Sequence, residues 1–148
     1  MRTEGVKMKV NWLVTACLAS TIFIMCSDRG DDWDIYEEMR ADMAIYDLSG
    51  IGLGVDIVSA PSNAVVDSLR IELNITHEDY TNLDIKLIHD ADSFLVWDNN
   101  YPGGVYEQSV DHFDGAPANG YWEIVICDSV PDGNEGTLKR FTLMINVQ

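Results

Sequence analysis

The chain has 148 residues, of which 25 are acidic and nine are Lys or Arg, and its formal net charge is −16. This acidity argues against nucleic acid as a partner, because binding it depends on Lys and Arg that neutralise phosphates. Hydrophobic residues make up 47% of the chain, which is enough for a buried core. We therefore expect one folded domain with at most a tail.

Residues 1–26 have the features of an export signal. Arg2, Lys7 and Lys9 precede a mostly apolar run over residues 10–25, which is shorter than the roughly 20 residues of a membrane-spanning helix. This pattern is typical of a secretory signal peptide. Cys26 follows the run directly and resembles the cysteine of a bacterial lipoprotein junction, which is acylated and becomes the mature N-terminus. An ordinary cleaved signal and an uncleaved anchor are the alternatives.

Residues 27–44 are predicted to form an acidic tether between the signal and the folded domain. Their first part is polar and contains Asp28, Asp31, Asp32 and Asp34, a composition typical of a solvated spacer. A short amphipathic helix over residues 33–43 is a further interpretation of the second part. Signal, cysteine and tether together predict a lipid-anchored or secreted protein of the bacterial cell envelope, on a membrane face that the sequence leaves open.

The segment Leu69–His77 carries the strongest structural signal in the chain. Its aliphatic and polar side chains alternate strictly, in the order Leu69, Arg70, Ile71, Glu72, Leu73, Asn74, Ile75 and Thr76. A period of two places all four aliphatic groups on one face of an extended strand, whereas a helix would spread them around its circumference. One face of this strand is therefore expected in a core and the other in water.

Similar short segments recur to the end of the chain, separated by turns rich in Gly, Pro, Asn and Asp. Strands are expected near residues 51–58, 65–77, 83–87, 94–97, 106–113, 122–127 and 141–147. Antiparallel sheets with one wet face must pack in pairs. The expected fold is therefore all-β, a jelly-roll-like antiparallel β-sandwich over residues 45–148.

Three separated motifs resemble the P domain (P/homo B domain) of kexin- and subtilisin-like proprotein convertases. They are Leu73-Asn74-Ile75-Thr76-His77 with Leu83-Asp84-Ile85-Lys86-Leu87 after a loop, then Phe113-Asp114-Gly115 with Ala118-Asn119-Gly120-Tyr121-Trp122, and finally Gly136-Thr137-Leu138 before the last strand. The resemblance covers residues 51–148. It implies a jelly-roll module that binds or stabilises a partner, such as a subtilisin-like protease on another chain, and that does not itself catalyse.

The residues themselves give little support for an enzyme. There is no Gly-x-Ser-x-Gly elbow, no His-Glu-x-x-His motif and no pair of cysteines spaced for zinc. His77 is expected to form a hydrogen bond with the backbone of a neighbouring loop, and His89 and His112 are expected to be solvated in loops. Cys127 lies out of phase with the apolar residues of its strand and is expected to be a structural thiol.

Calcium is the metal that the sequence favours. It takes six to eight oxygen ligands, which acid-rich loops beside strands can supply. One cluster is expected from Asp111 and Asp114 with Asp128, and another from the segment Asp128–Glu135 with Asp132 and Asn134. The candidate ligands are Asp84, Asp111, Asp114, Asp128 and Asp132.

A cell-surface carbohydrate-binding module is the alternative function. Jelly rolls often bind glycans, and a stacking platform is conceivable from Trp97, Tyr101, Tyr106 and Tyr121. Aromatic residues in or beside strands are more often part of the core. Trp122 shares the phase of Ile124 and Ile126 and is expected to be buried.

Overall fold

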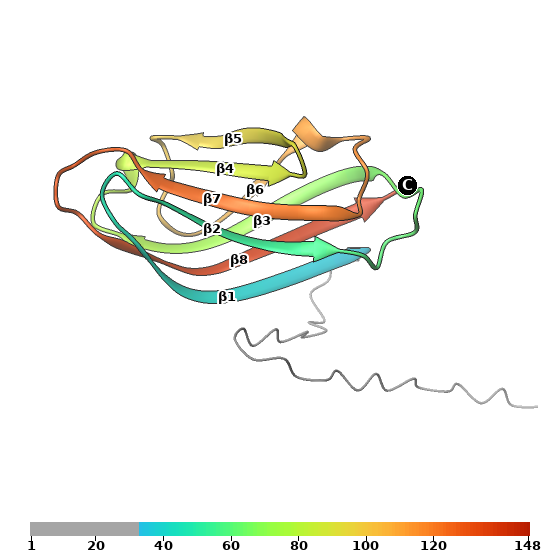
Figure 1. The fold of residues 1–148 in the computed structure, drawn as a ribbon, viewed down its shortest axis with the longest axis horizontal. Coiled ribbons are helices and arrows are strands. Elements are labelled where there is room, and N and C mark those ends of the chain that lie inside the picture. Colours follow the sequence, from blue (N-terminus) through green and yellow to red (C-terminus); the bar gives the residue numbers. More distant parts are fainter. Residues whose placement is uncertain (1–32) are drawn as a thin grey trace, which may run out of the picture.

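The computed structural model describes residues 33–148, which form two four-stranded sheets packed face to face (Figure 1). The strands are β1 (Ile35–Ile45), β2 (Gly50–Ile57), β3 (Val66–His77), β4 (Leu83–His89), β5 (Asp92–Asp98), β6 (Gly104–Ser109), β7 (Gly120–Asp128) and β8 (Gly136–Val147). Two short 3-10 helices, η1 (Tyr80–Asn82) and η2 (Asp111–Phe113), lie in the connections. The signal segment, Cys26 and residues 27–32 of the expected tether lie outside the described residues.

The order of the strands defines a jelly roll. Sheet A has the order β1-β8-β3-β6 and sheet B has the order β2-β7-β4-β5, and every neighbouring pair is antiparallel. The chain crosses from one sheet to the other at each connection except the β4–β5 turn, which is the connectivity of an eight-stranded jelly roll. The predicted all-β sandwich is therefore confirmed.

The core lies between the two sheets and consists of the residues that alternation placed there. In β3, the side chains of Leu69, Ile71, Leu73 and Ile75 are buried. Facing them across the sandwich are the equally buried residues of sheet B, which include Leu83, Ile85, Leu87, Trp122, Ile124 and Ile126. Burial of this apolar surface is the main force that holds the sheets together.

The sandwich begins earlier than the sequence indicates. Residues 35–44, assigned above to a tether or a short helix, belong to β1, which pairs with β8 along the edge of sheet A. A register shift between Arg40 and Met43 interrupts this strand. A bulge of this kind changes which face a side chain points to, so the alternation that marks a strand is lost from the sequence.

The motif Ala118–Trp122 covers the first residues of β7 and the end of the connection before it. The side chain of Asn119 accepts a hydrogen bond from the Ala60 backbone nitrogen (3.1 Å) and donates one to the Ala60 carbonyl (2.9 Å). The indole of Trp122 donates to the Ala118 carbonyl (3.1 Å). Gly120 has φ +127°, and a Cβ at this position would contact the Asp90 carboxylate. Ala118, Asn119, Gly120 and Trp122 thus have structural roles at the end of the sandwich where β7 begins.

Truncating Ile124 to Ala should destabilise the fold strongly. Ile124 is fully buried in the centre of β7, so the substitution removes apolar contacts and leaves a cavity at a cost of about 2–5 kcal/mol. Val58→Ala, at an exposed position after β2, should change the free energy of unfolding by less than about 0.5 kcal/mol. Urea unfolding of both variants measures the difference, and equal losses would contradict the assignment of the core.

Candidate metal centre

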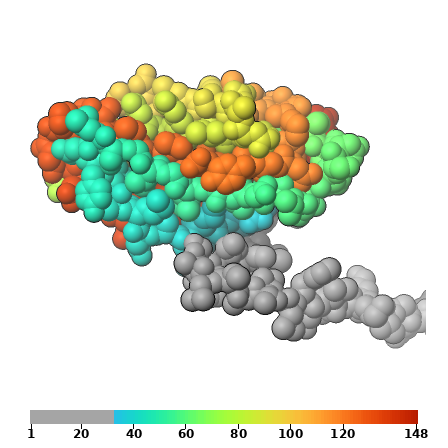
Figure 2. All heavy atoms as spheres, viewed as in Figure 1, coloured from blue at the N-terminus to red at the C-terminus, as the bar shows by residue number. Residues whose placement is uncertain are grey.

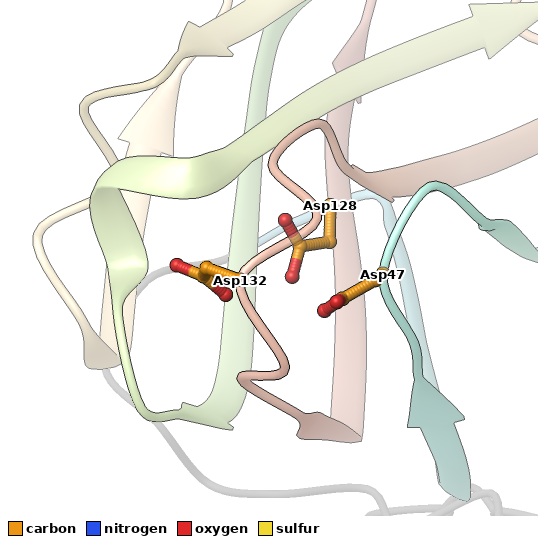
Figure 3. A group of neighbouring side chains, drawn as sticks. All are labelled: Asp47, Asp128 and Asp132. Atoms are coloured by element: carbon orange, nitrogen blue, oxygen red, sulfur yellow. The ribbon is translucent and has the colours of Figure 1, made fainter.

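Three aspartates from different parts of the chain converge at one end of the sandwich (Figure 3). Asp47 follows β1, Asp128 is the last residue of β7, and Asp132 lies in the connection from β7 to β8. One carboxylate oxygen from each residue lies within 4.8 Å of the others. The group is therefore compact enough for one ion to contact all three side chains.

The alternation of β7 explains why an acidic group points inward here. Trp122, Ile124 and Ile126 take the inward positions of the strand, and the next position of the same phase is Asp128. Its side chain has a relative exposure of 0%. A strand that supplies the core with apolar groups thus ends by placing a carboxylate at the edge of that core.

The short connection from β1 to β2 brings Asp47 to this carboxylate. Asp47 and Asp128 form an isolated parallel bridge. The turn is closed by hydrogen bonds to the Tyr46 carbonyl from the backbone nitrogen (3.1 Å) and the hydroxyl (2.6 Å) of Ser49. Leu48, which lies between Tyr46 and Ser49 in this turn, has φ +52°, a left-handed conformation that is uncommon for a residue with a side chain.

Each of the three carboxylates accepts hydrogen bonds from backbone N–H groups or side-chain amides. Asp128 Oδ1 accepts from the Val130 nitrogen (3.0 Å), and Asp47 Oδ2 accepts from the Gly133 nitrogen (2.7 Å). Asp132 accepts from the Asn134 backbone (2.9 Å) and from the side chain of Asn82 (2.7 Å). These bonds orient the carboxylates and connect the β1–β2, β3–β4 and β7–β8 connections.

Two buried oxygens of the group have no hydrogen bond. They are Oδ2 of Asp128 and Oδ1 of Asp47. Within residues 33–148, no Lys or Arg forms an ion pair with Asp47, Asp128 or Asp132. Burying a carboxylate without a partner is costly, and buried charges are usually paired or bound to metals. The unsatisfied oxygens therefore fit a cation held by all three side chains.

His77 also lies beside Asp128. Its Nε2 is 3.2 Å from Asp128 Oδ2, in an orientation that makes no hydrogen bond, and both side chains are fully buried. Its Nδ1 lies 2.8 Å from the Asp79 carbonyl oxygen and 3.1 Å from the Asp79 nitrogen. The predicted hydrogen bond between His77 and a neighbouring loop backbone is confirmed.

Two of the five predicted ligands belong to this group, Asp128 and Asp132. Asp111 is the first residue of η2 and Asp114 follows its last residue. The next residue, Gly115, donates to the Val66 carbonyl at the start of β3, so both aspartates lie at the opposite end of the sandwich. Asp84 pairs with Cys127 and Asp98 on the outer face of sheet B. The expected cluster of Asp111 and Asp114 with Asp128 is therefore wrong.

Asp47 was not predicted as a ligand because β1 was not recognised as a strand. Once β1 is known to end at Ile45, Asp47 becomes an acidic residue in a short connection at a strand end. Asp128 and Asp132 occupy comparable positions. The position of Asp47 beside Asp128 depends on a long-range bridge that no local pattern encodes.

Three of the four aromatic residues considered for glycan stacking form a cluster, in which the ring centroids are 5.1 Å apart for Trp97 and Tyr101, 6.0 Å for Trp97 and Tyr106, and 6.4 Å for Tyr101 and Tyr106. Trp97 and Tyr101 are buried, and the Tyr101 hydroxyl donates to the Gly104 carbonyl (2.9 Å). Burial raises the pKa of Tyr101, so its hydroxyl stays protonated at neutral pH. Tyr106 and Tyr121 are exposed but lie on β6 and β7, which belong to different sheets. Of the clustered rings only Tyr106 is exposed, so these four side chains do not present several open rings side by side for stacking.

The other two histidines also have structural contacts. His89 is buried, stacks on Trp122 with ring centroids 3.9 Å apart, and donates to the Pro117 carbonyl (2.8 Å). The expectation of a solvated loop residue is wrong for His89. His112 is partly exposed, stacks on Phe94 (4.7 Å) and lies 3.1 Å from the Asp92 carboxylate. Cys127 is a free, half-buried thiol, as expected.

Several solved structures have a similar fold. No protein-family model and no curated protein matches the sequence. A serine protease of Aeromonas sobria aligns with a TM-score of 0.63 and 13% identity, over 75% of this chain and 26% of the protease chain. The structure of that protease with the chaperone ORF2 gives a TM-score of 0.61, 13% identity and the same two coverages.

FlhE is a further structural neighbour, with a TM-score of 0.58 and 9% identity over 76% of this chain and 92% of FlhE. At these identities the similarities show the fold alone. This chain spans about a quarter of the protease chain, at 26%, and nearly all of FlhE. The same sandwich thus occurs within a protease and as almost an entire chain. In the described part of this chain, no helix has the length and hydropathy needed to cross a bilayer.

Gly136→Ala should disturb the metal centre through His77. A Cβ at Gly136 would contact the imidazole of His77 and the Thr76 carbonyl, and such overpacking costs about 1–3 kcal/mol. Gly50 also begins a strand, but a Cβ there would meet only the Ile126 oxygen at 4.0 Å. Gly50→Ala should therefore leave thermal stability nearly unchanged. Equal melting temperatures for the two variants would contradict the tight packing of His77 beside β8.

Proposed function

We propose that the protein is a non-catalytic β-sandwich module that binds or stabilises a partner protein and that uses calcium to fix one end of its fold. The observation that carries the calcium part is the fully buried Asp128 carboxylate, which has an unsatisfied oxygen beside Asp47 and Asp132. A bound cation would neutralise these charges and tie the end of β7 to two connections.

The donor set favours calcium over softer metals. All three candidate ligands are carboxylates, whereas zinc and copper prefer nitrogen or sulfur. Calcium accepts six to eight oxygens in flexible geometry, and main-chain carbonyls and water can complete its shell. Magnesium demands nearly ideal octahedral geometry, which suits ligands drawn from three separate segments less well.

Fold and motif together support a protein partner. The sandwich is similar to part of a serine protease, and one structure of that protease also contains a chaperone. The three motifs that resemble convertase P domains are built into the loops and strand ends of this sandwich. We therefore infer that the module is P-domain-like and that its partner is a subtilisin-like protease supplied on another chain.

The proposed location is the bacterial cell envelope. It follows from the predicted signal peptide and from acylation of Cys26, both of which lie outside the described residues. β1 begins at Ile35 and runs toward the metal centre at Ile45. A lipid anchor at Cys26 would therefore join the sandwich at the end opposite to Asp47, leaving the metal centre accessible to a partner.

Calcium should raise the melting temperature of the purified protein. A ligand bound only by the folded state stabilises it by about 2.7 kcal/mol at a hundredfold excess over Kd, which moves the midpoint by several degrees. Asp128→Asn and Asp132→Asn should each remove most of this rise. Asp114→Asn, at the other end of the sandwich, should retain it. An equal calcium response in Asp128→Asn would contradict the assignment of the site, and no response in the native protein would contradict calcium binding.

A subtilisin-like protease from the same envelope should keep its activity for longer when the module is present. We expect the two purified proteins to co-elute in size-exclusion chromatography and the half-life of protease activity to increase. The Ile124→Ala variant, whose fold is weakened, should protect less. If the proteins elute separately and the half-life is unchanged, this class of partner is wrong.

A further inference from the structure

The metal centre lies at an end of the sandwich that combines exposed apolar groups with acidic ones. This end, here called the loop end, consists of the connections at residues 46–49, 78–82, 99–103 and 129–135. Hydrogen bonds join them, including Gly133 to Asp47 (2.7 Å), Asn82 to Asp132 (2.7 Å) and Ser129 to Asn99 (3.1 Å). The four connections therefore form one surface.

Three large apolar side chains project from the loop end into water. Their relative exposures are 54% for Tyr46, 66% for Leu48 and 37% for Val130. Tyr46 and Leu48 flank Asp47, and Val130 lies between Asp128 and Asp132 in the sequence. Figure 2 shows the β1–β2 and β7–β8 segments side by side at the left end of the molecule. The same two segments thus carry both the aspartate group and the exposed apolar side chains.

The turn that exposes Leu48 is held in place. Leu48 has φ +52°, and both hydrogen bonds from Ser49 to the Tyr46 carbonyl close the turn around it. Asp47 is fixed by the Gly133 nitrogen (2.7 Å). A preorganised apolar group loses less conformational entropy on binding than a mobile one. The exposed leucine is therefore suited to contact a partner.

The charged side chains of the loop end are all acidic. Its four connections contain no Lys or Arg and five acidic residues, which are Asp47, Glu78, Asp79, Asp132 and Glu135. A shallow cavity of about 350 Å³, wide open to solvent, lies between Glu78 and Glu135 and is also lined by Thr76, His77, Gly136 and Thr137. Two carboxylates and two hydroxyls are the groups that an Arg or Lys side chain prefers as acceptors.

We propose that the loop end is a docking surface for a protein segment that carries an Arg or Lys beside aliphatic side chains. The basic group enters the cavity between Glu78 and Glu135, and the aliphatic groups cover Leu48, Tyr46 and Val130. This proposal rests on the proposed function, because it gives the partner-binding module its contact surface. Calcium strengthens docking by fixing the two connections that carry the apolar groups.

Charge favours a basic protein segment over an anionic membrane. The chain has a net charge of −16, and Glu78, Asp79 and Glu135 lie outside the metal group. These carboxylates keep their charge when calcium is bound, so they repel anionic headgroups and attract Arg or Lys. The partner surface that complements the loop end is therefore apolar in its centre and basic at its rim.

Defined peptides test the docking surface. A fluorescent peptide of alternating Leu and Arg is compared with one that has Glu in place of Arg and one that has Ser in place of Leu, by fluorescence polarisation with calcium and with chelator. The Leu-Arg peptide should bind about tenfold more tightly than either control, and chelator should weaken its binding. Equal binding of the three peptides would overturn the proposal.

Variants locate the binding on the loop end. Leu48→Ser and the double variant Glu78→Gln with Glu135→Gln should each weaken binding of the Leu-Arg peptide by about fivefold or more. The matched control is Val58→Ser, which changes an equally exposed apolar residue near the opposite end and should bind like the native protein. All four positions are at the surface, so the melting temperatures should stay close to that of the native protein.

The outcomes separate this proposal from the proposed function. If protease binding persists in Leu48→Ser, the module still binds a partner but the docking surface is wrong. If peptide binding is lost in Leu48→Ser while calcium gives no thermal shift, the docking surface stands and the calcium site is wrong. Calcium-dependent sedimentation with vesicles of phosphatidylcholine and phosphatidylglycerol, lost in Leu48→Ser, would assign the loop end to a membrane and overturn the proposal.

Discussion

The organisation of the molecule depends on one buried carboxylate. Asp128 continues the inward face of β7 beyond Ile126, so the core ends at a negative charge that has no Lys or Arg partner among the described residues. Burying a carboxylate is costly unless it is paired. The His77 imidazole lies 3.2 Å from Asp128, while Asp47 and Asp132 add two further carboxylates on which no Lys or Arg is placed. The proposed cation would balance these carboxylates, and the stability of the fold would then depend on the end of β7.

The jelly roll explains why this compensation affects a surface. Its connectivity brings the β1–β2 and β7–β8 connections together although residues 47 and 132 are distant in sequence. The proposed ion at their contact would fix both connections at once. Since Tyr46, Leu48 and Val130 lie in those connections, the geometry of the exposed apolar patch depends on the same carboxylates. Stability and partner binding are therefore expected to be linked.

Prediction from sequence succeeded where a strand has one buried face and an uninterrupted period. Leu69 to Ile75 and Trp122 to Ile126 meet that condition, and their buried faces are as expected. β1 does not, because its register shift between Arg40 and Met43 breaks the alternation. Trp97 was ambiguous for a similar reason, since β4 and β5 change register between Ile85 and Lys86. One of the three aspartates, Asp47, could not be predicted because its pairing with Asp128 is a tertiary contact.

The most direct measurement is a crystal structure of the protein grown in calcium, with the ion identified by its anomalous scattering. The account predicts one ion bound by carboxylate oxygens of Asp47, Asp128 and Asp132 at roughly 2.3–2.6 Å, with main-chain carbonyls or water completing its shell. Density for an ion elsewhere, with Asp128 Oδ2 hydrogen-bonded to His77 alone, would contradict it. The buried charge would then be balanced by the imidazole, and the loop end would owe its shape to hydrogen bonds without a metal.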